Sequence, residues 1–290
     1  MGNKLLIIDG NNMVNRAYYA VPTLTDPHGR AVNAIKGSIN ILMKTIYKEN
    51  PSHIMAVFDA KAKTFRHKAY PEYKGTRNAK PPELNAQIDA VEELFHLMGI
   101  RTFAVKGVEA DDIAGSVACF AEKLDFEVVI LSGDKDMLQL CSEKVSVKMP
   151  SNGGQYVLYD RDKFVEKYGF QPKEIIDYKA LMGDPSDNIK GVPKIGEKTA
   201  MKLIQDFGTI EEIYTNIDKI SKPSVKKALE DNRDLAIFSK KLVTICTKMT
   251  PAFPMDDLLI GPFDTPEAKN KLAEYNIRSN IKLQDVSKTA

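Results

Sequence analysis

Cysteine and long apolar runs are scarce in this chain, and tryptophan is absent. The cysteines, Cys119, Cys141 and Cys246, lie far apart and form no CxxC pair, so neither a disulfide framework nor a zinc site is indicated. The apolar runs fall far short of the roughly 20 residues needed to cross a bilayer, and nothing at Met1 resembles a signal peptide. These absences predict a soluble, cytoplasmic protein with reduced thiols and no membrane partner.

Apolar side chains are nevertheless plentiful, since 43% of the 290 residues are hydrophobic, enough for one large domain or two smaller ones. Apolar runs alternate with segments of helical periodicity at Ala34–Lys48, Leu84–Met98 and Asp111–Lys123, which predicts βαβ units and a parallel sheet. After Tyr159 we expect a helical region, with short helices at Arg161–Tyr168, Pro172–Met182, Lys198–Phe207, Ile210–Asn216 and Ser224–Thr247. The polar end of the chain, QDVSKTA, is expected to fray.

Positive charge is concentrated in one segment, although the net charge is only +2. Between Lys61 and Lys80 there are seven basic residues and one acidic residue, Glu72, with Tyr70 and Tyr73 interleaved. This pattern is typical of a segment that holds a phosphate backbone beside aromatic rings; a solvated loop is the alternative. Prolines and Gly75 interrupt the segment, which we expect to be a mobile binding element.

Negative charge is concentrated in five short clusters, most of which follow an apolar run such as KLLII, HIMAVF, RTFAVKGV or EVVILSG. Ligands of open parallel sheets bind beyond the carboxyl ends of the strands, so acids distant in sequence could share one pocket. Such crowding is repulsive unless cations bind there. The clusters are Asp9; Asp59; Glu109, Asp111 and Asp112; Asp134 and Asp136; and Asp184 and Asp187.

The clusters contain neither histidine nor cysteine, and oxygen ligands of this kind suit Mg²⁺, with Mn²⁺ as an alternative. Two such ions about 3.5–4 Å apart can activate water and stabilise both the attacking and the leaving oxygen of a phosphodiester. No Ser–His or Cys–His arrangement is evident, so a protein nucleophile is not expected. Lys74 and Arg77 could stabilise charge on the scissile phosphate. Taken singly, each carboxylate pair could instead be a helix cap or a solvated turn.

A second signal is GVPKIGEKTA, at Gly191–Ala200. Gly191 and Gly196 would let the backbone approach a phosphate closely, and the amides that open the following helix attract anions. Lys194 and Lys198 add positive charge. This hairpin pattern indicates sequence-independent binding of duplex DNA; an ordinary glycine turn between packed helices is the alternative.

Seven motifs together resemble the bacterial and phage 5′-nucleases, a family that includes the 5′→3′ exonuclease domain of DNA polymerase I and the flap endonucleases. The resemblance extends from Lys4 to Phe263. The motifs are IIDGNN with Arg16, VFDAK, YPEYKGTR, GVEADD, SGDKD, MGDPSDN and GVPKIGEKTA.

The resemblance implies an α/β fold in two parts. Residues 1–170 would form a PIN-like 5′-3′ exonuclease N-terminal catalytic domain, with a helical arch at about residues 65–90. Residues 171–264 would form a helix–three-turn–helix DNA-binding domain, followed by a C-terminal segment at 265–290. Because the chain leaves no room for polymerase or proofreading domains, it looks like a standalone homologue of the polymerase-linked nuclease.

The resemblance also implies roles for individual residues. Arg16, Lys74 and Arg77 would contact the scissile phosphate, Tyr73 would stack beside them, and Lys179 and Lys198 would contact DNA. Backbone carbonyls near Ile189, Val192 and Ile195 would hold a K⁺ ion. One divalent metal site would comprise Asp9, Asp59, Glu109, Asp111 and Asp134, and the other Asp112, Asp136, Asp184 and Asp187.

The expected enzyme is thus a Mg²⁺-dependent structure-specific 5′-nuclease, acting as 5′→3′ exonuclease and flap endonuclease in primer removal and repair. Its substrates would be duplex DNA with 5′ flaps, overhangs or RNA primers, and we expect a monomer without a small-molecule cofactor. A DNA-binding module with a structural cation would lack one of the metal ligands. A PIN-type ribonuclease would need no hairpin at Gly191–Ala200, and a phosphatase of small esters would lack both the hairpin and the arch.

Overall fold

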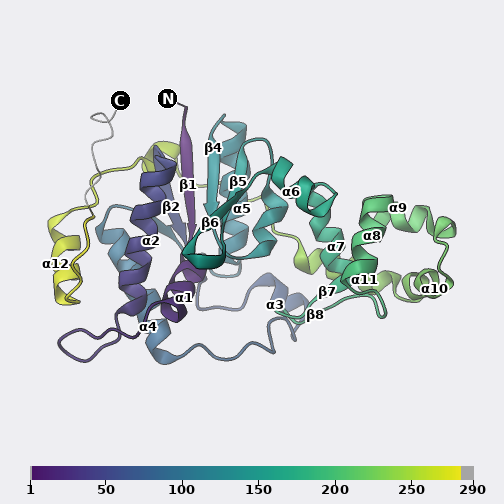
Figure 1. Cartoon of the computed structure of the whole chain (residues 1–290), viewed down its shortest axis with the longest axis horizontal. Helices are drawn as coiled ribbons and strands as arrows, with labels where there is room; N and C mark the ends of the chain where they lie inside the picture. The colour runs from purple at the N-terminus through teal and green to yellow at the C-terminus, as the bar shows by residue number, and fades with distance from the viewer. Residues whose placement is uncertain (1, 282–290) are drawn as a thin grey trace.

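The computed structural model describes residues 2–281, and its centre is a six-stranded sheet (Figure 1). The strands lie side by side in the order β3-β2-β1-β4-β5-β6. All neighbouring strands are parallel except β5 and β6, which are antiparallel. The bounds are β1 (Lys4–Asp9), β2 (His53–Val57), β3 (Arg101–Phe103), β4 (Glu127–Leu131), β5 (Val145–Pro150) and β6 (Tyr156–Tyr159).

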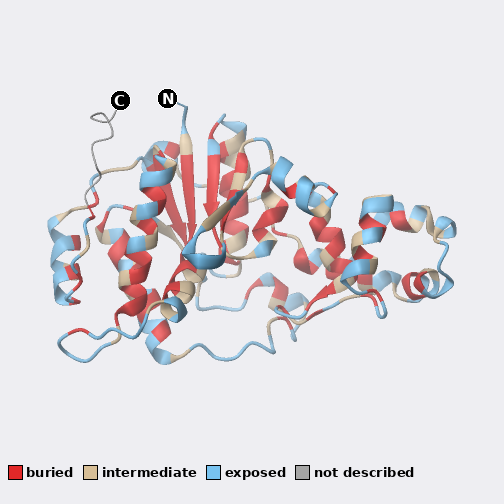
Figure 2. Ribbon diagram, in the orientation of Figure 1, coloured by how far each residue is buried: buried red, intermediate tan, exposed pale blue. Residues whose placement is uncertain are grey.

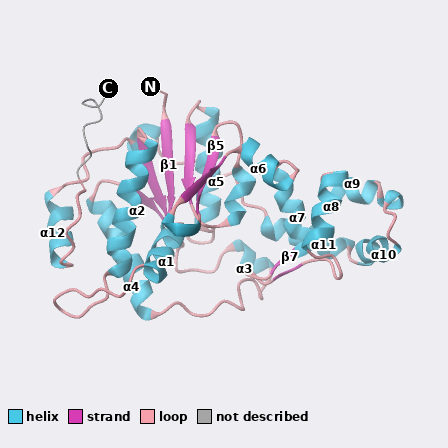
Figure 3. Cartoon of the chain, in the orientation of Figure 1, coloured by secondary structure: helices cyan, strands magenta, loops and turns pink. Residues whose placement is uncertain are grey.

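The sheet separates two layers of helices, and side chains of the central strand β1 point to both (Figure 3). Leu6 and Ile8 point to the layer formed by α1 (Gly10–Ala20), α2 (Asn33–Glu49) and α4 (Pro82–Leu97). Leu5 and Ile7 point to the opposite layer, which contains α5 (Ala110–Lys123). All four side chains are completely buried, as expected for a parallel strand that is covered on both faces. The predicted parallel-sheet core is confirmed.

The order of the strands reverses between β1 and β4. From β1 the chain continues through β2 to β3 on one side, and then returns to β4 and β5 on the other. At such a switch point the loops after two neighbouring strands diverge and leave a crevice beyond their carboxyl ends. Asp9 ends β1 and Asp134 follows β4, so both lie at this crevice.

The strand β3 is shorter than the run RTFAVKGV suggests, because only Arg101–Phe103 pairs with β2. Gly107 has a φ of +92° and turns the chain, and its carbonyl accepts a hydrogen bond from the Phe65 amide. Glu109 therefore caps the start of α5 instead of directly following a strand.

The helical region extends to one side of the sheet, at the right of Figure 1. The single helix expected at Ser224–Thr247 is two helices, because Asn232 leaves helical geometry and its side chain donates to the Ala228 carbonyl. Strands β7 (Gly183–Asp184) and β8 (Ile189–Lys190) form a small antiparallel hairpin. The helices are α6 (Arg161–Tyr168), α7 (Ile175–Met182), α8 (Glu197–Phe207), α9 (Ile210–Thr215), α10 (Pro223–Asp231) and α11 (Arg233–Val243).

After α11 the chain returns to the sheet. Leu259 forms a β-bridge with His53, and the Ile260 amide donates to the Ser52 carbonyl at 3.0 Å. The last helix, α12 (Pro266–Glu274), packs against α4 and buries Leu272 there. The helical region is therefore anchored to the α/β core at both ends. The segment QDVSKTA, which we expect to fray, lies outside the described residues.

The segment expected to form the arch divides into two parts. Residues 65–81 comprise α3 (Phe65–Ala69), a series of turns and a loop, whereas residues 82–90 are the first half of α4. Leu84 and Ile88 of α4 are buried in the core, as Figure 2 shows for this layer. The part that can lie over the sheet edge is thus residues 65–81.

The remaining short elements are 3₁₀ helices. They connect longer elements and are η1 (Lys135–Leu140), η2 (Asn152–Gly154), η3 (Pro172–Glu174), η4 (Ile217–Lys219) and η5 (Met255–Leu258). No helix within residues 2–281 is long and apolar enough to span a membrane.

Candidate active site

A cavity of about 430 Å³ lies at the switch point of the sheet. Four of the predicted carboxylates, Asp9, Asp59, Asp111 and Asp134, line it together with basic side chains and asparagines. They come from the end of β1, the loop after β2, the start of α5 and the loop after β4. We refer to these four as the pocket carboxylates. The basic residues Arg16, Lys74, Arg77 and Lys80 also line the cavity.

Local hydrogen bonds orient the pocket carboxylates. Asp9 caps α1 by accepting from the Asn12 amide at 3.0 Å, and it also accepts from the Ser132 hydroxyl at 2.7 Å. Asp59 accepts from the Ala110 amide at 3.1 Å, and Asp134 caps η1. The side chain of Asn12 in turn accepts from the Gly133 amide at 2.8 Å. Sequence reasoning missed Asn12 and Ser132, although Asn12 lies in the motif IIDGNN and Ser132 lies in SGDKD.

Burial and mutual repulsion raise the pKa values of three pocket carboxylates, Asp9, Asp111 and Asp134. Burial raises the pKa of Asp9 to about 7, and the charges of Asp134 and Asp59 add to the effect of burial. Burial followed by the charge of Asp9 raises the pKa of Asp111 well above its usual value, and burial likewise raises the pKa of Asp134. A divalent cation would relieve this repulsion, and the oxygen donors fit Mg²⁺ or Mn²⁺.

Asp136 and Asp184 share one basic partner, Lys179. The Lys179 ammonium contacts both carboxylates, at 2.7 Å from Asp184. Burial tends to raise the pKa of Asp184, but Lys179 and Ser186 outweigh it, so the net pKa is lowered. The predicted DNA-contacting Lys179 is therefore an internal counter-ion in this structure.

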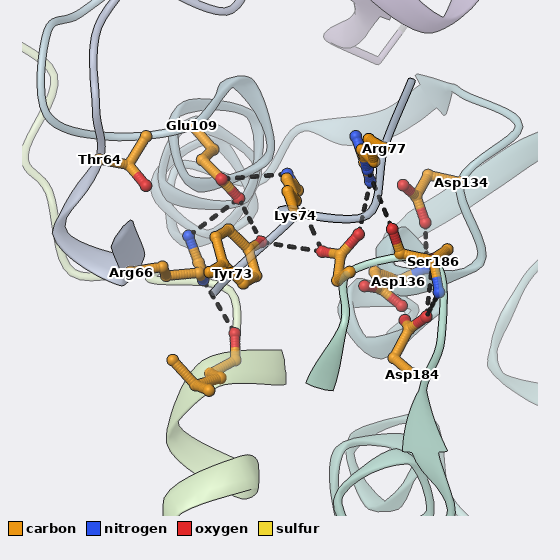
Figure 4. Close-up of polar contacts among 12 residues, drawn as sticks. Thr64, Arg66, Tyr73, Lys74, Arg77, Glu109, Asp134, Asp136, Asp184 and Ser186 are labelled. Carbon is orange, nitrogen blue, oxygen red and sulfur yellow. Dashed lines mark hydrogen bonds and ion pairs between the residues drawn. The ribbon is translucent and has the colours of Figure 1, made fainter. Parts of the chain in front are cut away.

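Glu109 and Asp187 are joined through the segment of residues 73–77. The Tyr73 hydroxyl lies 3.0 Å from Glu109 and 2.8 Å from Asp187, and the Lys74 ammonium lies 3.0 Å from Glu109. Arg77 completes the group with an ion pair to Asp187 at 2.5 Å (Figure 4). Lys74 and Arg77 thus reach the cavity from residues 65–81.

The predicted stacking role of Tyr73 does not agree with its position. Its side chain is only 3% exposed, and its hydroxyl is engaged by two carboxylates. Burial and the charges of Glu109 and Asp187 raise its pKa, so it stays a neutral donor. Tyr73 orients these carboxylates and presents no free ring face to DNA.

Asp112 also differs from its prediction as a metal ligand. It is fully buried, and both of its oxygens lie 2.8 Å from the Arg66 guanidinium. The amides of Glu109 and Cys246 donate to the same two oxygens. With every lone pair directed into these contacts, Asp112 forms a structural pair on the side of α5 away from the cavity.

Arg66 is a residue that sequence reasoning counted only as surface charge. Its side chain is 3% exposed, and it donates to the carbonyls of Leu242 and Thr244 as well as to Asp112. Its guanidinium also donates to Glu109 at 3.2 Å (Figure 4). It therefore ties α3 to the start of α5 and to the chain leaving α11. Arg66 lies in the run TFRH, and nothing in that run distinguishes it from its exposed basic neighbours.

The predicted DNA-binding hairpin lies directly after β8. Ile189, Val192 and Ile195 are buried, and Lys194 takes a left-handed conformation with φ of +67°. A Cβ on Gly191 would lie 2.3 Å from the Met182 carbonyl carbon, so close packing requires this glycine. Gly196, by contrast, has open space around it and caps α8.

Lys198 lies in the first turn of α8, and Arg16 lies on α1 with its guanidinium 5.5 Å from the Tyr156 ring. Within residues 2–281 no three side chains of His, Cys, Asp or Glu converge as a ready-made metal site. Instead, the carboxylates other than Asp112 form three adjacent groups, and cationic side chains lie between them. These groups are the pocket carboxylates, Asp136 with Asp184, and Glu109 with Asp187.

Family models match nearly the whole chain. Residues 4–169 match the 5′-3′ exonuclease N-terminal resolvase-like domain, and residues 170–266 match the 5′-3′ exonuclease C-terminal SAM fold. The chain belongs to the 5′-3′ exonuclease family. The resemblance noted from the motifs and the expected α/β fold with a helical second part are both confirmed.

Curated relatives of this family member include DNA polymerases I. That of Bacillus subtilis is 44% identical over 245 residues, which are 84% of this chain and 28% of the polymerase. That of Geobacillus stearothermophilus is 43% identical over 280 residues, 96% of this chain and 32% of the polymerase. The chain thus spans about a third of the length of these relatives.

Solved structures show the same fold. The T5 D15 protein, co-crystallised with metal ions, is 25% identical with a TM-score of 0.67, over 94% of this chain and all of that one. The catalytic core of Rad2, in complex with a DNA substrate, is 16% identical with a TM-score of 0.58, over 94% and 88% of the two chains. The Rad2 likeness concerns the fold alone.

Proposed function

We propose that this chain hydrolyses phosphodiesters of DNA at 5′ ends and flap junctions, as a metal-dependent 5′→3′ exonuclease and flap endonuclease. The observation that carries the proposal is the cavity at the switch point. It combines the four pocket carboxylates, of which Asp9 is buried, with Arg16, Lys74 and Arg77. Membership of the 5′-3′ exonuclease family and the likeness to the T5 D15 protein, which was crystallised with metal ions, support it.

The cofactor that we propose is a pair of Mg²⁺ ions, with Mn²⁺ as a substitute. The pocket carboxylates would hold the ions, joined by Glu109, Asp136, Asp184 and Asp187 directly or through water. When bound, the metal would supply activated water and stabilise the attacking and leaving oxygens. Asp112 has no part in this set, because both of its oxygens already accept hydrogen bonds from Arg66.

The basic side chains of the chain would position the substrate. Lys74 and Arg77 now neutralise Glu109 and Asp187, which holds them beside the cavity in their charged forms. A scissile phosphate that entered the cavity would provide a stronger partner for both, and their charge would then oppose the negative charge that develops on it. Arg16, which also lines the cavity, would hold the neighbouring phosphate.

The duplex part of the substrate would lie against the hairpin at Gly191–Ala200. Lys194 and Lys198 would contact its phosphates, and Lys179 would contribute where it is released from Asp136 and Asp184. Carbonyls near Ile189, Val192 and Ile195 would take a K⁺ ion. We propose a monomer that acts on DNA with 5′ flaps, overhangs or RNA primers in the cytoplasm, in primer removal and repair.

Cleavage of a 5′-labelled flap duplex, with and without Mg²⁺, tests the proposal. Mg²⁺-dependent cutting near the flap junction is the expected result. A matched single-stranded RNA serves as the competing substrate, and cutting of the RNA alone would instead identify a ribonuclease. Tight binding of the duplex without cutting would identify a non-catalytic DNA-binding module.

A further inference from the structure

Two tight turns meet beside the cavity. The first, residues 72–77, carries Lys74 and Arg77, and we call it the arch turn. The second, residues 185–188, connects β7 to β8, and we call it the hairpin turn. The Lys74 amide donates to the Asp187 carbonyl at 2.9 Å, and the Asn188 side-chain amide donates to the Glu72 carbonyl at 2.8 Å. The Arg77 side chain also donates to the Ser186 carbonyl at 3.1 Å. Each turn thus donates to the backbone of the other, and the Asn188 side-chain amide is the donor on the side of the hairpin turn.

Both donors lie in a conformation that non-glycine residues seldom adopt. Lys74 has a φ of +55° and Asn188 a φ of +56°. Such residues are strained and persist where surrounding contacts hold them. Asparagine tolerates this conformation better than most residues, because its short polar side chain can hydrogen-bond locally. The two left-handed residues lie on the two sides of a single contact, so each turn holds the other in place.

The hairpin turn is continuous with the proposed duplex-binding hairpin. From Asn188 the chain forms β8 and reaches Gly191, whose backbone packs against Met182 and Gly183 without room for a Cβ. A rigid connection therefore extends from Gly191 to Asn188. The arch turn, in contrast, belongs to residues 65–81, and those after Ala69 form no helix or strand before α4.

We infer that Asn188 is a positioning residue, which aligns Lys74 with the cavity through the Glu72 carbonyl. The inference rests on the proposed nuclease function and extends it. Glu72 lies two residues before Lys74, so the Asn188 contact sets where the arch turn begins. The Lys74 ammonium lies 3.0 Å from Glu109 at the edge of the cavity. Misplacement of a catalytic group by about 1 Å can slow a reaction about 100-fold.

The Asn188→Gly variant separates the hydrogen bond from the backbone conformation. Glycine adopts the positive φ at no steric cost but lacks the donor to Glu72. We expect single-turnover cleavage of the flap duplex to slow about 10- to 100-fold, while the dissociation constant of the duplex changes by less than about two-fold. Asn232→Ala is the matched control, because Asn232 also donates to a backbone carbonyl, that of Ala228, in the distant helical region. The control should cleave at the wild-type rate.

A double-mutant cycle tests whether Asn188 acts through Lys74. Lys74→Met removes the ammonium but keeps the aliphatic stem. In that background Asn188→Gly should change the cleavage rate by less than about two-fold, because the group that it positions is already gone. Full additivity of the two changes, or a wild-type rate for Asn188→Gly alone, would overturn the inference.

Hydrogen exchange gives a readout that does not depend on activity. The Lys74 amide, which donates to Asp187, should exchange at least about ten-fold faster in Asn188→Gly than in the wild type. Unchanged protection would show that Asn188 does not hold the arch turn. If the wild type itself fails to cut DNA, the proposed function fails, while the exchange result still decides whether Asn188 holds the turn.

Discussion

At the scale of single residues, two adjacent carboxylates have opposite surroundings. Asp111 lines the cavity and faces Asp9 and Asp134, whereas Asp112 is fully buried against Arg66. Successive positions on a helix point in directions about 100° apart, so neighbours at the start of α5 must diverge. The sequence shows two aspartates in GVEADD but not which of them turns toward the cavity.

Substitution of each by asparagine should separate the two roles. Asp111→Asn should lower cleavage at least about 100-fold through loss of a proposed metal ligand, without lowering the free energy of unfolding. Asp112→Asn should lower the free energy of unfolding by about 1–3 kcal/mol, because it removes one of the two carboxylates, Asp112 and Glu109, that neutralise the buried Arg66 charge. Urea unfolding and single-turnover cleavage measure the two effects. Equal stability losses in both variants would contradict the assignment.

Tyr73→Phe distinguishes a role in orienting carboxylates from a role in stacking. Phenylalanine would stack on DNA as well as tyrosine, but it cannot donate to Glu109 and Asp187. We expect cleavage to slow about ten-fold, with duplex affinity unchanged. A wild-type cleavage rate would show that the hydroxyl is dispensable, and a loss of affinity alone would favour contact with DNA.

At the scale of elements, periodicity predicted most helices to within a few residues, because each buries one apolar stripe. The failures have local causes. The side chain of Asn232 ends α10. The turn at Gly107 leaves β3 shorter than the run RTFAVKGV. Residues 82–90 belong to α4, which packs in the core, and not to the arch. The hydrophobic pattern alone does not predict any of these three differences. The convergence of acids at the sheet edge was predictable, since strand order follows general rules, but the ion pairs among them depend on tertiary packing.

The hairpin after β8 permits a matched test with two glycines. Gly191→Ala should destabilise the protein by about 1–3 kcal/mol, because the new Cβ would overlap the Met182 and Gly183 backbone. Gly196→Ala should cost about 0.5 kcal/mol, since its Cβ meets open space and only the cap preference changes. Thermal unfolding of both variants provides the comparison. Similar losses would show that Gly191 is not required by packing.

At the scale of the whole molecule, the cavity collects carboxylates from segments far apart in the chain, so that a cation held by them would bind only the folded protein. Added Mg²⁺ should therefore stabilise the folded protein, because it binds the assembled site and not the unfolded chain. At a concentration ten times its dissociation constant, the stabilisation is about 1.4 kcal/mol, or about 2–4 °C in the unfolding temperature.

Asp134→Ala provides the control for this measurement. It removes a pocket carboxylate but leaves the sheet intact, so the Mg²⁺-dependent rise should shrink or vanish, and cleavage should be lost while duplex binding remains. NaCl at matched ionic strength separates specific binding from screening. An equal rise in the variant and the wild type would place the bound ion elsewhere.

The return of the chain to the sheet after α11 has a consequence for synthesis on the ribosome. Arg66 obtains its carbonyl partners, Leu242 and Thr244, from residues made 176 and 178 positions later. At about 5–20 residues per second, roughly 10–35 s pass between the two. During that interval the nascent catalytic half holds an arginine that lacks two of its acceptors. Completion of the active-site scaffold must therefore wait for the end of the helical region to leave the exit tunnel.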